Sequence, residues 1–456
     1  MVKFLFLDNW ELEVVEGFAR RLQRPEKHPD NPLMIADQPW ENGNMQLYGS
    51  VVRRPDGLFQ LWYSVIHEPW TMRLAYAESD DGIEWHRPRL ELFEWQGQQT
   101  NIVFTDNPHG PAVIYDAEDP REHWRYKMVA GASPHHHAGC IHGFHSPDGI
   151  HWEQVGPGPI IATPPDCPMA FYRQQDGRYV VHHRLQGYGR RVFRSDSWDF
   201  QRFSEPRMIM EPDAGDGPQV QHYGMGATTC GPYHIGTLWI YHTEPSALTS
   251  GKMAGYQEAE LTYARSGYAW HRAAQGEAFI PHGEPADWDR GNLQCASQPV
   301  FMEHEIRYYY MGTTARHESR WELLPQTAGL GMARLRPDGF VALEASEETA
   351  ELLTVGFALP SDRLHVNAAV RADGWVRAEL LRADGSPVPG CTMEDCAPLE
   401  GDRTDHRLRW PGGNVDSVVG EGVRLRVQAR EASLFSVYAL EPDEEPVYWR
   451  FAAARR

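Results

Sequence analysis

The sequence predicts an all-β protein, a five-bladed β-propeller followed by a small antiparallel β-sandwich. Three observations carry this prediction: an internal repeat built on Asp-Gly turns, five pairs of strand-like segments, and regular apolar-polar alternation after about residue 340. Long runs of apolar residues at three-four spacing, which would indicate helices, do not occur in the sequence. The one segment with a helical pattern is 10–22 (WELEVVEGFARRL).

The repeat is clearest at two places in the chain. Segment 79–85 (SDDGIEW) is echoed by segment 146–152 (SPDGIHW), and weaker echoes occur at 194–200, 265–270 and 336–340. An Asp-Gly pair supplies the positive φ of a tight turn, and the Trp after it re-enters a strand and packs between neighbouring sheets. We therefore expect the motif to be structural and to mark the outer hairpin of each blade.

Upstream of each echo lies a pair of segments rich in aromatic and β-branched residues, the types that favour strands. The five pairs are NMQLYGSVVRR with LFQLWYSVI, PAVIYD with WRYKMVAG, AFYRQ with RYVVHHR, MGATTC with HIGTLWIYH, and QPVFME with IRYYYMGT. The spacing between echoes suits four strands and their loops in each blade. We expect residues 1–340 to form a catalytic propeller and residues 341–456 to form an accessory sandwich.

Charge and composition narrow the classes of partner. A formal net charge of −20 disfavours binding to nucleic acid or to an anionic membrane surface, because both need a basic face. The N-terminal segment lacks the pattern of a signal peptide, and no apolar run is long enough for a spanning helix, so we expect a soluble, cytoplasmic protein. The six cysteines form no CxxC pair, which indicates reduced core cysteines. The 16 Trp and 19 Tyr offer rings on which sugars can stack.

This architecture and one motif resemble glycoside hydrolase family 32, the invertase and levanase-like enzymes, and its relatives in families 43 and 68. In family 32 the third blade opens with a Glu-Cys-Pro motif that carries the acid/base, and here Asp166-Cys167-Pro168 precedes the strand MAFYR. The family's nucleophile motif, Asn-Asp-Pro, corresponds to PWENGN, in which Glu41 is the acid. The family's Arg-Asp-Pro motif corresponds to segment 106–111 (DNPHGP), which departs from it and leaves the sugar open.

In a propeller, the starts of inner strands and the ends of second strands surround one pocket. Glycoside hydrolysis uses two carboxyl groups, and the resemblance implies that Asp166 is the acid, while Glu41 and Glu244 compete for the second role. Each of these acids also has a structural interpretation, as a turn acceptor or a solvated loop acid. The residues expected to bind substrate in this pocket are Trp40, His109, His183, Arg184, Tyr223, His242, Gln294, Arg316 and His317.

The sequence therefore predicts a glycosidase, exo-acting on short oligosaccharides or other glycosides, furanosides among them. Three alternatives stay open: a non-catalytic carbohydrate-binding propeller, a sugar phosphorylase, and a histidine- and metal-dependent lyase acting on uronates. The phosphorylase alternative needs a basic pocket, for which the candidates are Arg184, Arg190, Arg191 and Arg316.

No cofactor and no catalytic metal are predicted. The histidine run 135–137 could attract a cation, but adjacent side chains in a strand or loop diverge. The sequence leaves open a central structural cation such as calcium, the linkage that is cleaved, the stereochemical course and the oligomeric state.

Overall fold

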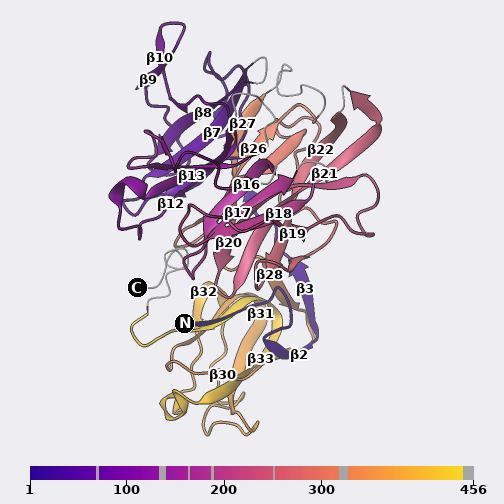
Figure 1. The fold of residues 1–456 in the computed structure, drawn as a ribbon. Helices are drawn as coiled ribbons and strands as arrows, with labels where there is room; N and C mark the ends of the chain where they lie inside the picture. Colours follow the sequence, from indigo (N-terminus) through magenta and orange to yellow (C-terminus); the bar gives the residue numbers. More distant parts are fainter. Residues whose placement is uncertain are drawn as a thin grey trace. The chain divides into compact units, whose positions relative to one another are not determined.

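The protein is all-β, as predicted, in a computed structural model that describes residues 1–67, 71–132, 140–162, 165–185, 189–249, 252–317 and 327–444 (Figure 1). The chain forms two compact units. Among the described residues, one comprises Pro25–Met302 and Ile306–Arg334, and the other comprises Met1–Arg24, Glu303–Glu305 and residues 335–444. The first 24 residues, which we expected in the propeller, therefore lie in the second unit. Within the described residues, no helix is long and apolar enough to cross a membrane.

The first unit is a five-bladed β-propeller in which each blade is an antiparallel sheet. Blade one contains β6 (Val51–Arg53), β7 (Phe59–His67), β8 (Thr71–Ser79) and β11 (Ile102–Phe104), with the hairpin β9 (Leu90–Trp95) and β10 (Gln98–Thr100) inserted before β11. Blade two contains β12 (Pro108–Tyr115), β13 (Tyr126–Ala132), β14 (His142–Ser146) and β15 (Glu153–Gln154), with the short 3-10 helix η1 (Glu122–Trp124). Blade three contains β16 (Pro165–Arg173), β17 (Tyr179–Leu185), β18 (Val192–Ser197) and β19 (Arg207–Met210). Blade four contains β20 (Val220–Cys230), β21 (Tyr233–Thr249), β22 (Lys252–Ala264) and β23 (Trp270–Arg272).

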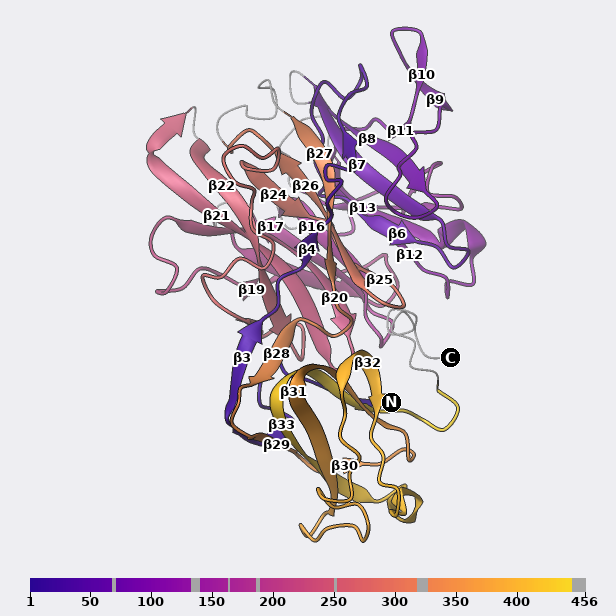
Figure 2. The same ribbon diagram turned by 180° about the vertical axis from the view of Figure 1, so that it is seen from behind.

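The fifth blade is completed by strands from the start of the chain. Its own strands are β24 (Asn292–Cys295), β25 (Val300–Phe301), β26 (Ile306–Thr313) and β27 (Ala328–Leu335). Strands β4 (Glu26–Lys27) and β5 (Met34–Ile35) pair with the outer side of β27, and Figure 2 shows β4 in indigo among the orange strands of this blade. The ring is thus closed by pairing between segments about three hundred positions apart.

The five predicted strand pairs are all confirmed, as β6 with β7, β12 with β13, β16 with β17, β20 with β21, and β25 with β26. The predicted helix over 10–22 is wrong, because this segment forms β2 (Leu12–Glu16) and β3 (Phe18–Leu22). Gly17, at a φ of 73°, separates the two strands, and Val14 and Val15 suit a strand better than a helix. The segment is a pair of strands and not a helix because β2 pairs with β29 and β3 pairs with β28.

The two clear copies of the Asp-Gly repeat attach blade two to blade one and blade one to blade five. The indole nitrogen of Trp62, on β7 of blade one, donates to the carbonyl of Gly149 in the blade-two turn at 2.7 Å. The Tyr309 hydroxyl, on β26 of blade five, donates to the carbonyl of Gly82 in the blade-one turn at 2.8 Å. Trp85 of that turn packs edge-on against the Tyr309 ring at 5.9 Å between centroids. The motif is therefore structural, as expected.

Ser297, between β24 and β25, connects the inner strands at the centre of the ring. Its backbone nitrogen donates to the carbonyl of Gly49 in blade one at 3.0 Å, and its carbonyl accepts from the Ala227 nitrogen in blade four at 2.9 Å. Its hydroxyl accepts from the backbone nitrogen of Phe171 in blade three at 2.8 Å and donates to the carbonyl of the same residue at 3.1 Å. One fully buried serine thus holds together four of the five blades.

A second serine attaches the remaining blade. The Ser50 hydroxyl of blade one accepts from the backbone nitrogen of Val113 in blade two at 2.9 Å. Because these contacts fix the inner strands at one level along the axis, the residues just before them in each blade lie at the same end of the propeller.

The second unit is a nine-stranded antiparallel sheet that curls into a sandwich-like form, which confirms the predicted class. It contains β1 (Val2–Leu5), β2, β3, β28 (Val341–Ala345), β29 (Ala350–Thr354), β30 (Phe357–Ala358), β31 (Leu364–Arg382), β32 (Gly401–Arg407) and β33 (Gly422–Ala439), with the 3-10 helix η3 (Val415–Val418). The long strand β33 pairs along its length with β1, β28, β29, β30 and β31. Its alternate side chains, such as Val423, Leu425 and Val427, are buried in one apolar core.

We predict that Gly149→Ala destabilises the propeller more than Gly156→Ala. Both glycines have positive φ, 79° and 66°, so each substitution carries a strain of about 1–2 kcal/mol. A Cβ on Gly149 would lie 2.6 Å from Cζ2 of Trp62, whereas one on Gly156 meets nothing within 4 Å. The clash should add about 1–3 kcal/mol, measured as the difference in urea midpoint between the two variants. Equal midpoints would show that the turn is not pinned by Trp62.

Candidate functional site

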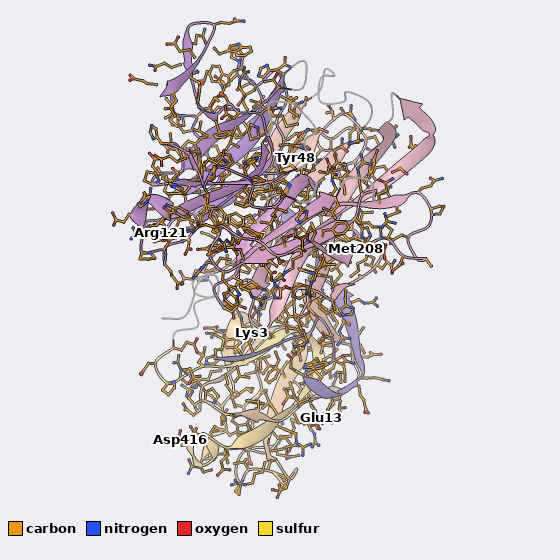
Figure 3. All side chains as sticks on the ribbon, viewed as in Figure 1. Lys3, Glu13, Tyr48, Arg121, Met208 and Asp416 are labelled. Carbon is orange, nitrogen blue, oxygen red and sulfur yellow. The ribbon has the colours of Figure 1, made fainter. Side chains whose placement is uncertain are left out.

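Residues at the starts of inner strands converge at one end of the propeller axis. Tyr48, labelled in Figure 3, lies inside the propeller unit just before the axial contact of blade one. Its hydroxyl is 3.2 Å from the Tyr223 hydroxyl at the start of β20, and its ring meets that of His109, from β12, at 6.1 Å between centroids. His109 in turn lies beside Asp166 and Cys167 of β16, with potential ligand atoms within 4.8 Å of one another.

The ends of second strands complete this group. They contribute Arg184 from β17 and Tyr241 from β21, and His317 follows β26. We define the axial site as these residues of all five blades together with the arginine before β18: Tyr48, His109, Asp166, Cys167, Arg184, Arg190, Tyr223, Tyr241 and His317.

The inner strands are irregular where they approach the axial site. Their pairing registers shift between His109 and Ala112 in β12, between Pro168 and Ala170 in β16, and between His222 and Gly224 in β20. A shift of this kind turns the side chains out of the usual alternation, and β-bulges often direct side chains at active sites. In these three blades, therefore, the residues next to the shift do not follow the regular alternation of side chains along a strand, and that alternation would predict the wrong side for them.

The central interaction of the site is the ion pair between Asp166 and Arg184. The Arg184 Nη2 is 2.6 Å from Asp166 Oδ2 and 3.3 Å from the Cys167 sulfur, and Nη1 donates to the Tyr223 carbonyl at 3.2 Å. The guanidinium also lies 4.6 Å from the centroid of the Tyr223 ring. The arginine side chain is 5% exposed and that of the aspartate is 40% exposed. A fixed, buried cation thus positions a carboxylate that solvent can reach.

The protonation state of Asp166 follows from these neighbours. Burial favours its neutral form, but the charges of Arg184, His109 and Arg190 outweigh burial and hold the Asp166 pKa below its usual value. Burial opposes the charge of Arg184, yet the facing carboxylate leaves the Arg184 pKa raised. An aspartate kept ionised is suited to act as a base, a nucleophile or a hydrogen-bond acceptor. It is less suited to the proton-donor role that the sequence suggested.

A chain of hydrogen bonds links the aromatic residues of the site. His317 Nε2 is 3.3 Å from the Tyr223 hydroxyl, and its Nδ1 is 3.0 Å from the Tyr241 hydroxyl. Burial raises the pKa of Tyr241 to about 12 and that of Tyr48 well above its usual value, so both phenols keep their protons near neutral pH. Neutral phenols held in this way form a rigid wall that can donate hydrogen bonds to sugar hydroxyls.

A second, more exposed group lies next to the axial site. Arg316 pairs with Glu244, and their side chains are 46% and 43% exposed. His242 stacks on Tyr256 at 4.5 Å between centroids and has Nε2 2.9 Å from a Glu258 oxygen. The carboxylate of Glu244 and the Arg316 charge both act on the Tyr241 phenol electrostatically. Glu244 lies within β21 and pairs with Arg316, the residue before His317 of the axial site.

The structure places Glu41 in a structural network instead. Its side chain is fully buried, and its carboxylate accepts from Tyr63 at 2.5 Å, from Arg87 Nε at 2.8 Å and from the Gln38 backbone nitrogen at 2.9 Å. Its oxygens are thus occupied within blade one. The indole of Trp40 is also fully buried and donates to Asn101 at 2.7 Å, so it offers no face for stacking a sugar.

Two further predicted residues are internal to the blades. His183 is fully buried with Nε2 3.1 Å from the Ser195 hydroxyl, and burial lowers its pKa to about 4. Gln294 is fully buried and donates to Gln257 at 3.3 Å.

Among the predicted residues, the axial site brings together Asp166, His109, Arg184, Tyr223 and His317, with Glu244, Arg316 and His242 beside it. Sequence reasoning missed Tyr48 and Tyr241. Both lie in strand-like segments that were correctly predicted, so their positions in those segments could have identified them.

The group His109, Asp166 and Cys167 has the ligand types of a metal site, but its surroundings do not suit a cation. The Arg184 guanidinium already occupies Asp166 Oδ2 and faces the cysteine sulfur. Burial raises the pKa of Cys167 to about 12. The histidine run 135–137 lies outside the described residues.

Comparisons with known proteins give distant similarities only. No family model matches the chain, and no curated protein matches it. A β-1,2-mannobiose phosphorylase from Listeria innocua is 12% identical over 69% of this chain and 97% of its own, with a TM-score of 0.47. A family 32 β-fructofuranosidase from Bombyx mori is 12% identical over 92% of this chain and 94% of its own, at 0.41. An α-L-arabinofuranosidase from Podospora anserina is 12% identical over 71% and 98%, at 0.45. The predicted resemblance is confirmed as a distant one.

We predict that Glu41→Ala lowers stability far more than Glu244→Ala. The first substitution leaves Arg87, whose side chain is 15% exposed, without its buried partner, which costs about 3–5 kcal/mol. The second breaks an exposed pair, worth less than about 1 kcal/mol. Urea unfolding of both variants checks the difference. A Glu41→Ala variant that is as stable as the wild type would restore Glu41 as a candidate for catalysis.

Proposed function

We propose that the protein cleaves a glycosidic bond of a short oligosaccharide or other glycoside at the axial site. The observation that carries this proposal is the partly exposed Asp166 carboxylate, held ionised where residues from all five blades converge. Breaking the bond between the anomeric carbon and the glycosidic oxygen requires a proton for that oxygen and a new oxygen for the carbon. An ionised carboxylate at the axis can supply the second function, either directly or through water.

Two carboxylates border the Tyr223 and Tyr241 wall. Asp166 lies on the Arg184 side of it, and Glu244 acts on Tyr241 from the Arg316 side. In our assignment Asp166 is the base or nucleophile and Glu244 is the second carboxyl group of the reaction. The buried His317, bonded to the Tyr223 and Tyr241 hydroxyls, would hold these phenols in place as a rigid wall between the two acids. The ion pair disfavours a metal-dependent lyase that uses His109, Asp166 and Cys167 as ligands, because Arg184 already binds the Asp166 carboxylate.

We expect Asp166→Asn to lower kcat by about 10²–10⁴-fold, because the amide can neither take a proton nor attack the anomeric carbon. The assay is sugar release from a panel of aryl glycosides and short oligosaccharides, furanosides included. Asp176→Asn is the matched control on the same blade, since Asp176 pairs with Arg178 at 2.8 Å and is not part of the axial site. Glu244→Gln should also lower kcat on these substrates, because it removes the second carboxyl group.

Two results would contradict this assignment. Full activity of Asp166→Asn would remove Asp166 from the reaction. Binding of a sugar by the wild type without release from any substrate would instead support the non-catalytic carbohydrate-binding alternative.

The pH profile gives an independent check on the role of Asp166. Because the charge of Arg184 lowers the Asp166 pKa in the folded protein, the active ionised form persists on acidification and is lost only as the pH falls through that lowered pKa. Arg184→Met removes the main charge that opposes the effect of burial, so the acid limb of kcat/KM should move to higher pH. Arg178→Gln should leave the limb in place. An acid limb near pH 6 in the wild type would assign the base to another group.

A further inference from the structure

Arg190 is a cation of the axial site whose charge is not matched by an acid. It precedes β18, and its Nη1 donates to the side-chain oxygen of Gln221 at 2.9 Å. Its guanidinium lies 5.0 Å from the centroids of both Tyr223 and Tyr241. In the part of the chain that the structure describes, no carboxylate forms an ion pair with it, and its Nε is shielded from water without an acceptor.

The other cations around the site are paired. Arg184 binds Asp166 at 2.6 Å, and Arg316 binds Glu244. In the axial site as defined above, two arginines, Arg184 and Arg190, face one carboxylate, that of Asp166, so these residues carry a surplus positive charge. This surplus occurs in a chain whose formal net charge is −20. A local charge opposite to that of the whole protein, at a place that small molecules reach, is the electrostatic pattern of an anion-binding site.

The geometry points to Arg190 as the binding group for an oxyanion that enters the axial site: a carboxylate, sulfate or phosphate. The two tyrosine rings hold the plane of the guanidinium, and Gln221 holds the Nη1 end. The Nη2 end is left, and its N–H groups can donate to the oxygens of an oxyanion. The location of the ligand rests on the proposed function of the axial site, whereas anion binding itself does not require turnover.

Two sources of the oxyanion have the same recognition chemistry. It can be part of the sugar, as in a uronic acid or a sulfated sugar. It can also be free phosphate that replaces water: one phosphate oxygen then bonds to the anomeric carbon, the glycosidic bond breaks, and the departing oxygen takes a proton. The products would be a sugar 1-phosphate and the shortened alcohol, with no change in oxidation state.

The first experiment measures binding without turnover. Isothermal titration calorimetry with inorganic phosphate, sulfate and glucuronate compares the wild type with Arg190→Gln and with Arg191→Gln. Arg191 is the matched control because it is adjacent in sequence, is 37% exposed and pairs with Glu211 at 3.0 Å. We expect the wild type and Arg191→Gln to bind at least one of the three anions, and Arg190→Gln to bind it about tenfold or more weakly. The proposal is overturned if the wild type binds none of them, or if Arg190→Gln binds as the wild type does.

The second experiment assigns the source and separates this proposal from the proposed function. Cleavage of neutral aryl glycosides that requires phosphate and yields a sugar 1-phosphate identifies phosphate as the oxyanion. Cleavage of uronides or sulfated glycosides in phosphate-free buffer, reduced in Arg190→Gln mainly through a higher KM, places the anion on the sugar. If Arg190 binds anions but no glycoside is cleaved, the anion site stands and the glycosidase proposal fails. If neutral glycosides are cleaved equally well with and without phosphate and Arg190→Gln is unaffected, the anion proposal fails and the glycosidase proposal stands.

Discussion

The central hydrogen bonds of Ser297 are the constraint on which the axial site depends. Through its nitrogen, carbonyl and hydroxyl this one residue bonds to blades one, three and four. Backbone groups in the centre of a propeller have few strand partners, and a buried donor or acceptor without a partner is costly. Satisfying them across blades fixes the height of each inner strand, so that Tyr48, Asp166 and Tyr223 meet at one end.

Periodicity and turn chemistry were sufficient to predict the blades, because these are local properties of the sequence. The same reasoning located Asp166 and Arg184, since strand ends follow from strand positions. It failed for His183, because neighbouring residues on a strand face opposite sides and Arg184 takes the axial side. It failed for Glu41 because its partner Arg87 lies 46 positions later, and such pairings are not visible in a local pattern. The bulges beside His109 and His222 likewise have no signature in residue type alone.

The electrostatic character of the axis differs from that of the chain as a whole. Acidic residues give the protein its overall charge, while Arg184 and Arg190 meet over the Tyr223 ring. Aromatic faces stabilise guanidinium groups without neutralising them, so these cations still attract an anion and still hold Asp166 ionised. Substrate attraction and the protonation state of the carboxylate therefore have a common origin.

The pairing of β4 and β5 with β27 has a consequence for the order of folding. These partners are separated by most of the propeller sequence, so the fifth blade stays incomplete until the ribosome has released residues beyond 335. Until then β4 and β5 lack their partner strand, and the inner strands have no closed ring to align them. Slow closure and dependence on chaperones during synthesis are the expected result for a protein whose first strands complete its last blade.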